Sequence, residues 1–228
     1  MIEAAVDFIR APGLRRVSQL LADDVTRILR QAIGGRGRAF LAVPGGTTPR
    51  EFLTLLGQRN LPWESIAVIP TDERDVPPDD PRSNEHMIRQ CLPLTSGSLV
   101  PLRAVGASLE ASATALSTQI SAMGPLDVLV IGMGADAHIA SLFPGDRRLD
   151  RAGRATSPVV LASRPADLEP RLSLGPAPLM AARWKALLIS GQDKLAALNR
   201  AFVSNDPVTA PVRLLFEDGI PPRVYYTE

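Results

Sequence analysis

The sequence predicts an α/β fold in which a mainly parallel sheet is covered by helices on both faces. Short apolar runs typical of strands alternate along the chain with segments of helical periodicity. One run, Val128–Ile131, contains no polar residue, as expected of a strand that is buried on both faces. Gly132, Gly134 and polar side chains follow it, an arrangement typical of the carboxyl end of a parallel strand.

The composition is that of an ordinary globular protein. The 228 residues are 45% hydrophobic and 21% charged, and we expect a single domain over residues 1–228. The net charge of +1 and the aromatic content of 4% indicate neither nucleic acid nor a membrane surface as a partner. Cys91 is the only cysteine, which excludes an intrachain disulfide. The start of the chain carries Glu3 and Asp7 and does not resemble a signal peptide, and no apolar run is long enough to span a bilayer. We therefore expect a cytoplasmic protein.

Periodicity and turn residues define the elements of the N-terminal half. Apolar residues recur with helical spacing over residues 17–33, and Gly34 and Gly35 are expected to end that helix. The expected strands are at residues 4–10, 38–43, 66–70 and 99–102. The other expected helices are at residues 49–56, from 83 to about 91, and at 108–123.

The C-terminal half continues the alternation after the central strand. The expected strands are at residues 156–162, 171–174, 185–190 and 223–226, and the expected helices are at 177–182 and 192–203. Because parallel strands need long crossover connections, strands separated by helices favour a parallel sheet.

A loop rich in glycine and threonine follows the strand at 38–43 and consists of Gly45, Gly46, Thr47 and Thr48. Free N–H groups and the dipole at the start of the next helix favour an anion such as phosphate. The glycines allow close approach of the backbone, the threonine hydroxyls add donors, and Pro49 suits the first helical position. The alternative is a plain capping box between Thr48 and Glu51, whose carboxylate would compete with an anion.

Charged residues follow the strand at 66–70. Arg74 can bind phosphate or carboxylate oxygens with its guanidinium group, and Asp72 can accept hydrogen bonds from sugar hydroxyls or move a proton. The alternative is a solvated charged turn.

The loop after the central strand carries Asp136 and His138. A neutral imidazole can take a proton from water, which makes His138 a candidate general base, and Asp136 can orient it or contact the substrate. The alternative is a histidine bonded to the loop backbone. A zinc site is not expected, because neither a second histidine at ligand spacing nor a thiolate cluster is present.

Two further cations lie near predicted strand ends. Lys194 is in the first turn of the helix at 192–203, where the dipole disfavours a cation unless it helps to hold an anion. Arg171 begins a predicted strand, and an exposed surface position is the alternative for Lys194. Together the strand ends predict a pocket for a small, phosphorylated, hydroxyl-rich ligand.

These motifs, in this order, resemble those of the glucosamine-6-phosphate isomerase/6-phosphogluconolactonase family, whose fold is Rossmann-like. The resemblance covers nearly the whole chain. It rests on residues 45–49, on 71–74 with Ser83 and Asn84, on 132–145, and on Arg171 and Lys194. The Ser-Leu-Phe-Pro sequence at 141–144 is typical of the lactonases, since the deaminases usually carry Ala-Phe-Asn-Glu-Pro.

The resemblance implies hydrolysis of 6-phospho-D-glucono-1,5-lactone to 6-phospho-D-gluconate in the oxidative pentose phosphate pathway, with no metal or organic cofactor. It implies that His138 activates water with the help of Asp136. The implied phosphate ligands are Gly45, Gly46, Thr47, Thr48, Arg74, Arg171 and Lys194. The expected partner is a small phosphorylated sugar lactone, and the expected state is a monomer.

Two alternative functions stay open. One is a glucosamine-6-phosphate isomerase or deaminase on the same fold, with Asp72 moving a proton between carbons. The other is a non-catalytic sugar-phosphate-binding protein, suggested by Ala137, which stands where the family has glycine in Asp-Gly-His. If that position requires a positive φ, alanine adds strain of about 1 kcal/mol and can change the aim of His138.

Overall fold

The computed structural model describes residues 6–103, 108–166, 168–217 and 219–228. The strands are β1 (Phe8–Arg10), β2 (Ala39–Val43), β3 (Ile66–Pro70), β4 (Asp72–Arg74), β5 (Val128–Ile131), β6 (Val160–Ser163), β7 (Arg171–Leu174), β8 (Lys185–Ser190) and β9 (Arg223–Thr227). The helices are α1 (Leu14–Arg36), α2 (Thr47–Gly57), α3 (Asn84–Cys91), α4 (Leu109–Met123), α5 (Arg151–Thr156), α6 (Pro176–Met180) and α7 (Gln192–Ser204). Short 3-10 turns lie at Trp63–Ser65, Arg147–Leu149 and Pro211–Phe216.

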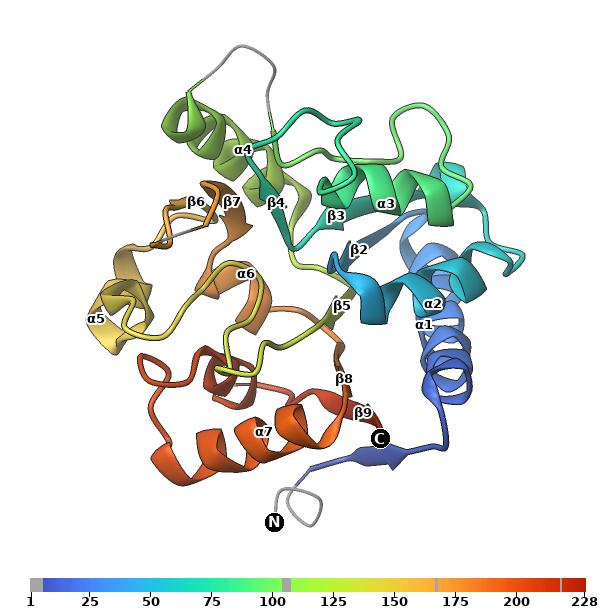
Figure 1. Ribbon diagram of the computed structural model, residues 1–228. Coiled ribbons are helices and arrows are strands. Elements are labelled where there is room, and N and C mark those ends of the chain that lie inside the picture. The colour runs from blue at the N-terminus through green and yellow to red at the C-terminus, as the bar shows by residue number, and fades with distance from the viewer. Residues whose placement is uncertain (1–5, 104–107, 167, 218) are drawn as a thin grey trace.

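A six-stranded sheet in the order β1-β9-β8-β5-β2-β3 forms the centre of the molecule, and each described pairing in it is parallel. The predicted fold class is therefore confirmed. Figure 1 shows α1, α2 and α3 together on one side, with α4, α6 and α7 on the other. Of the expected strand at 4–10, residues 4 and 5 lie outside the described residues, as does Glu3, and the described strand covers Phe8–Arg10.

The sheet separates two apolar clusters because successive side chains of a strand point to opposite faces. In β2, Leu41 and Val43 pack with the cluster under α1, α2 and α3, whereas Ala42 packs with the cluster under α4 and α7. In β5 every residue is buried, so the prediction of a strand covered on both faces is correct. Of the described helices, none is both long and apolar enough to cross a bilayer.

A second, three-stranded antiparallel sheet in the order β4-β7-β6 was not predicted. Its middle strand pairs Ser173 with Asp72 on one side and with Leu161 on the other. The expected strand at 156–162 was wrong at its start, because residues 151–156 form α5, which Asp150 caps by accepting a hydrogen bond from Gly153 N–H at 2.7 Å. The expected strand at 99–102 contributes only an isolated bridge between Val68 and Leu99.

The predicted end of the first helix was also wrong. Gly34 and Gly35 lie inside α1, and the helix ends one turn later, at Gly37, which adopts the left-handed conformation with φ of 73°. Its N–H group donates to Ile33 O at 2.7 Å, which satisfies a carbonyl of the last turn. The pair Gly34 and Gly35 therefore did not mark the cap, because of these three glycines only Gly37 adopts positive φ.

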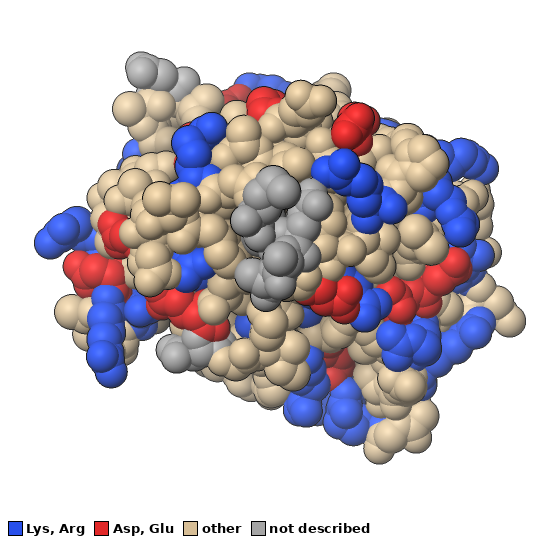
Figure 2. Space-filling model, turned by 90° about the horizontal axis from the view of Figure 1, so that it is seen from below, with Lys and Arg blue, Asp and Glu red and all other residues tan. Residues whose placement is uncertain are grey.

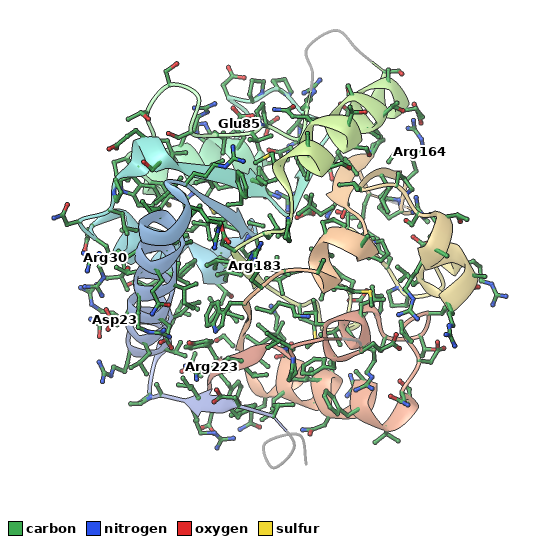
Figure 3. All side chains as sticks on the ribbon, turned by 180° about the vertical axis from the view of Figure 1, so that it is seen from behind. Asp23, Arg30, Glu85, Arg164, Arg183 and Arg223 are labelled. Carbon is green, nitrogen blue, oxygen red and sulfur yellow. The ribbon has the colours of Figure 1, made fainter. Side chains whose placement is uncertain are left out.

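Acidic and basic side chains are interspersed on the described part of the face shown in Figure 2. Some of them tie elements together. Arg223 of β9 donates to Asp24 of α1 at 2.8 Å, and Tyr225 O–H donates to the same carboxylate at 2.5 Å. Burial and the hydrogen bond to Asp24 raise the pKa of Tyr225 well above its usual range. This cluster, near Arg223 in Figure 3, fixes α1 to β9.

Two glycine substitutions test where α1 ends. We expect Gly37→Ala to lower the free energy of unfolding by about 1 kcal/mol, because alanine is strained at positive φ. We expect Gly34→Ala to raise it by about 0.5 kcal/mol, because nothing lies within 4 Å of a Cβ there and alanine is the better helix former. Urea unfolding of both variants measures these changes, and equal signs would contradict this helix end.

Candidate active site

The carboxyl ends of β2, β3, β5 and β8 open onto one cleft of about 260 Å³. The sequence-predicted residues that line it are Gly45, Gly46, Thr47, Thr48, Asp72, Arg74, His138, Arg171 and Lys194. Asp136 is the exception: it does not line the cleft, and its carboxylate lies against the ring of His138. The structure therefore brings together residues that are spread over most of the sequence.

The opposite edge of the sheet is organised differently. Asp127, directly before β5, is 3% exposed and pairs with Arg36 and with Arg183, whose Nε lies 3.4 Å away. Its second oxygen accepts a hydrogen bond from Phe40 N–H at 3.0 Å. Figure 3 labels Arg183 at this edge. The buried carboxylate there is paired within the protein, whereas the cleft is lined by the cations Arg74, Arg171 and Lys194.

The first turn of α2 forms one wall of the cleft. The helix begins at Thr47, and Gly46 is its N-cap with φ of 100° and no side-chain hydrogen bond. The capping-box alternative is wrong, because Glu51 accepts a hydrogen bond from Arg15 at 3.2 Å instead. Pro49 is the third residue of the helix rather than the first, and it has no N–H group to satisfy. The N–H groups of this turn remain available to an anion.

Glu73 anchors the next wall. Its buried carboxylate accepts hydrogen bonds from the backbone N–H groups of Arg74, Asn84 and Glu85 at 2.8, 2.9 and 2.7 Å, and from the Ser83 hydroxyl at 2.9 Å. The charge therefore lies at the N-terminus of α3, where the dipole favours it. Because Thr71, Asp72 and Glu73 are all buried, the alternative of a solvated turn is wrong.

Asn84 is a cleft residue that the site prediction missed. Its Nδ2 donates to the backbone oxygen of Asp72 at 2.7 Å, and its Oδ1 accepts from Arg74 at 3.3 Å. It also packs against the glycine loop, since a Cβ at Gly45 would lie 1.7 Å from Asn84 Oδ1. Thr71 and Met133 also line the cleft and were not predicted. Only the position of Asn84 beside Ser83 in the family motif indicated it.

His138 is held by Asp136. Its Nδ1 lies 2.6 Å from Asp136 Oδ1, and its backbone N–H donates to the same oxygen at 3.2 Å. The alternative of an imidazole bonded to loop backbone is therefore wrong. Partial burial opposes ionisation of Asp136, but the hydrogen bonds and charge of His138 lower its pKa. With Nδ1 committed to the carboxylate, Nε2 is the nitrogen that can act on a ligand in the cleft.

The backbone around His138 explains why Gly134 is a glycine and shows the conformation of Ala137. A Cβ at Gly134 would lie 2.2 Å from the ring nitrogen Nδ1, so glycine is required for the imidazole to pack there. Ala137 has φ of 68°, which confirms that its position requires positive φ. Its carbonyl oxygen accepts a hydrogen bond from Val212 N–H at 3.0 Å. With alanine at this position, His138 Nδ1 lies 2.6 Å from Asp136 Oδ1.

Arg171 and Lys194 complete the cationic side of the cleft. Arg171 Nη1 lies 3.9 Å from Asp72 Oδ2, and its guanidinium lies 5.8 Å from the ring centre of Phe143. Its Nε is buried and has no hydrogen-bond partner in the described structure. Lys194 is half-buried in the first turn of α7, so the alternative of an exposed lysine is wrong. An anion bound here would satisfy donors that the protein leaves open.

Among the described residues, no three His, Cys, Asp or Glu side chains are grouped so that they could hold a metal ion.

Comparison with known proteins gives consistent matches. The sequence profile of the family described as glucosamine-6-phosphate isomerases/6-phosphogluconolactonase matches residues 14–220. The 6-phosphogluconolactonase of Rhizobium meliloti strain 1021 is 38% identical over 217 residues, which cover 92% of this chain and 93% of the relative. That of Pseudomonas aeruginosa PAO1 is 39% identical over 85% of this chain and 84% of the relative. The crystal structure of a 6-phosphogluconolactonase from Shewanella baltica OS155 superposes with a TM-score of 0.89 at 28% identity, covering 98% of both chains.

Removal of the Glu73 carboxylate tests the anchor under the cleft. We expect Glu73→Ala to lower the free energy of unfolding by about 3 kcal/mol, because buried N–H groups lose their acceptor. Glu51→Ala, which removes only a surface ion pair with Arg15, is the control and is expected to change it by less than about 1 kcal/mol. Chemical unfolding of both variants measures the difference, and equal losses would contradict the anchoring role.

Proposed function

The chain belongs to the glucosamine-6-phosphate isomerase/6-phosphogluconolactonase family and is a lactone-hydrolysing enzyme; we propose that His138 is its general base on 6-phospho-D-glucono-1,5-lactone. The product is 6-phospho-D-gluconate, formed in the oxidative pentose phosphate pathway. The enzyme acts as a single domain and as a monomer. It needs no metal or organic cofactor, because a lactone is already activated toward water.

The phosphate end of the substrate binds at the first turn of α2. The free N–H groups after Gly45 and Gly46 and the hydroxyls of Thr47 and Thr48 supply donors. The guanidinium groups of Arg171 and Arg74 and the ammonium group of Lys194 balance the phosphate charge. Fixing the phosphate in this way holds the lactone carbonyl in place and removes part of the entropic barrier to attack.

The reacting end lies at His138. The observation that carries this proposal is the 2.6 Å contact between His138 Nδ1 and Asp136, made by an imidazole on the wall of the cleft. Asp136 keeps the ring oriented and stabilises its protonated form. Nε2 takes a proton from water as the oxygen attacks the carbonyl carbon, and the imidazolium then protonates the ring oxygen as the lactone opens.

Backbone N–H groups stabilise the oxyanion that forms on the carbonyl oxygen. The cleft offers those at Gly45, Gly46 and Gly132. The N–H group of Gly134 is committed, since it donates to His138 O at 2.9 Å. The oxyanion site is therefore one of the two glycine loops at the ends of β2 and β5.

The isomerase or deaminase alternative depends on Asp72 as a proton carrier. Asp72 Oδ2 already accepts a hydrogen bond from the Ser141 hydroxyl at 2.7 Å, and Arg171 lies beside it. Both contacts hold the Asp72 carboxylate in one position, which suits an acceptor for a sugar hydroxyl. The alternative of a non-catalytic binder was motivated by Ala137, and the intact bond between His138 and Asp136 argues against it.

Replacement of each histidine in turn tests the base. With freshly made 6-phosphogluconolactone at neutral pH, we expect the wild type to exceed spontaneous hydrolysis and His138→Ala to lose at least about 100-fold in kcat. His86→Ala is the matched control; His86 lies outside the cleft, 2.8 Å from Gln90, and its loss is expected to leave kcat unchanged. A wild type no faster than the spontaneous reaction would overturn lactone hydrolysis, and an active His138→Ala would overturn the base.

Ala137→Gly tests whether the departure from the family sequence impairs catalysis. Glycine relieves strain at φ of 68°, but the His138–Asp136 bond is already formed with alanine. We therefore expect kcat to stay within about twofold of the wild type. The measurement follows the acid that 6-phosphogluconolactone releases on hydrolysis at neutral pH. A variant about tenfold faster would show that alanine misplaces the imidazole.

A further inference from the structure

Ser141 connects the loop of His138 to the small sheet. It follows His138 closely in sequence and is completely buried. Its hydroxyl donates to Asp72 Oδ2 at 2.7 Å, its N–H donates to Ser173 Oγ at 3.1 Å, and its carbonyl oxygen accepts from Ser163 Oγ at 2.8 Å. All three polar groups of one residue are therefore engaged.

The partners of Ser141 lie on different strands of the small sheet. Asp72 belongs to β4, Ser173 to β7 and Ser163 to β6. The main-chain contacts attach the loop to the sheet, which is a structural role. The hydroxyl differs from them, because its partner, Asp72, is itself on the wall of the cleft.

The hydroxyl of Ser141 also determines how Asp72 presents its carboxylate. Oδ2 takes the short bond from Ser141, while Oδ1 has only the longer contacts, 3.3 Å to the Thr71 hydroxyl and 3.4 Å to Asn84 Nδ2. The Asp72 side chain is 11% exposed, so few other donors reach it. Oδ1 is thus the oxygen with acceptor capacity left for a hydroxyl group of a sugar.

We propose that Ser141 is a positioning residue for lactone hydrolysis. Its hydroxyl holds the Asp72 carboxylate at a fixed position relative to His138, where Asp72 can accept a hydrogen bond from a sugar hydroxyl. The role rests on the proposed function. A sugar ring held by Asp72 on one side and by the phosphate donors on the other presents its carbonyl in a single orientation. The same hydrogen bond holds the His138 loop against Asp72, so base and acceptor keep a constant separation.

Two matched serine variants test this role. Ser141→Ala and Ser163→Ala each remove one buried hydrogen bond of the same anchor, and we expect similar falls in Tm. Only Ser141→Ala breaks the connection to Asp72. We expect it to lower kcat/KM for 6-phosphogluconolactone about tenfold and to weaken binding of 6-phosphogluconate, while Ser163→Ala stays within about twofold of the wild type. Equal kcat/KM values for the two variants would overturn the positioning role.

A double-mutant cycle asks whether Ser141 acts through Asp72. When Asp72→Asn is already present, we expect Ser141→Ala to lower kcat/KM by less than about threefold further, because the charged partner is gone. A full tenfold loss on that background would overturn the role. The failure of the proposed function is distinguishable, since it shows in the wild type, whereas the failure of this inference shows only in the variants.

Discussion

In a parallel sheet all strands run in one direction, so their carboxyl ends meet at the same edge. In this protein the constraint brings the ends of β2, β3, β5 and β8 to one cleft. The central strands are buried on both faces and leave little room for polar side chains within the sheet. The polar residues of the site therefore lie in the loops, which the closely packed sheet supports.

The small antiparallel sheet supplies what the large sheet lacks, a wall facing its carboxyl edge. Its strands carry Asp72, Arg74 and Arg171, and its buried carboxylates hold neighbouring elements in place. Glu73 holds α3, and Asp72 holds the His138 loop through Ser141. Buried carboxylates are costly unless they are hydrogen-bonded, so these contacts allow only one arrangement of the wall. Arg74, Arg171 and Lys194 line the cleft, and their positive charges suit an anionic ligand.

The local sequence pattern was sufficient to predict the central strand and the loop that follows it. The apolar run Val128–Ile131 and the glycines after it indicated the central strand and its loop correctly. The antiparallel sheet was missed because it pairs Asp72 with Ser173, far apart in sequence and without a hairpin between them. The end of α1 was misplaced because composition does not show which glycine adopts positive φ. Asn84 escaped the site prediction because its role depends on contact with Gly45, which only the folded chain reveals.

The central claim is that one cleft holds the phosphate at α2 and the lactone carbonyl at His138. A crystal structure with the product, 6-phosphogluconate, tests it most directly. We expect the phosphate against the backbone of Thr47 and Thr48 and the guanidinium of Arg171, with the carboxylate within hydrogen-bond distance of His138 Nε2. A product bound with its phosphate at His138, or bound outside the cleft, would rule out this arrangement of the active site.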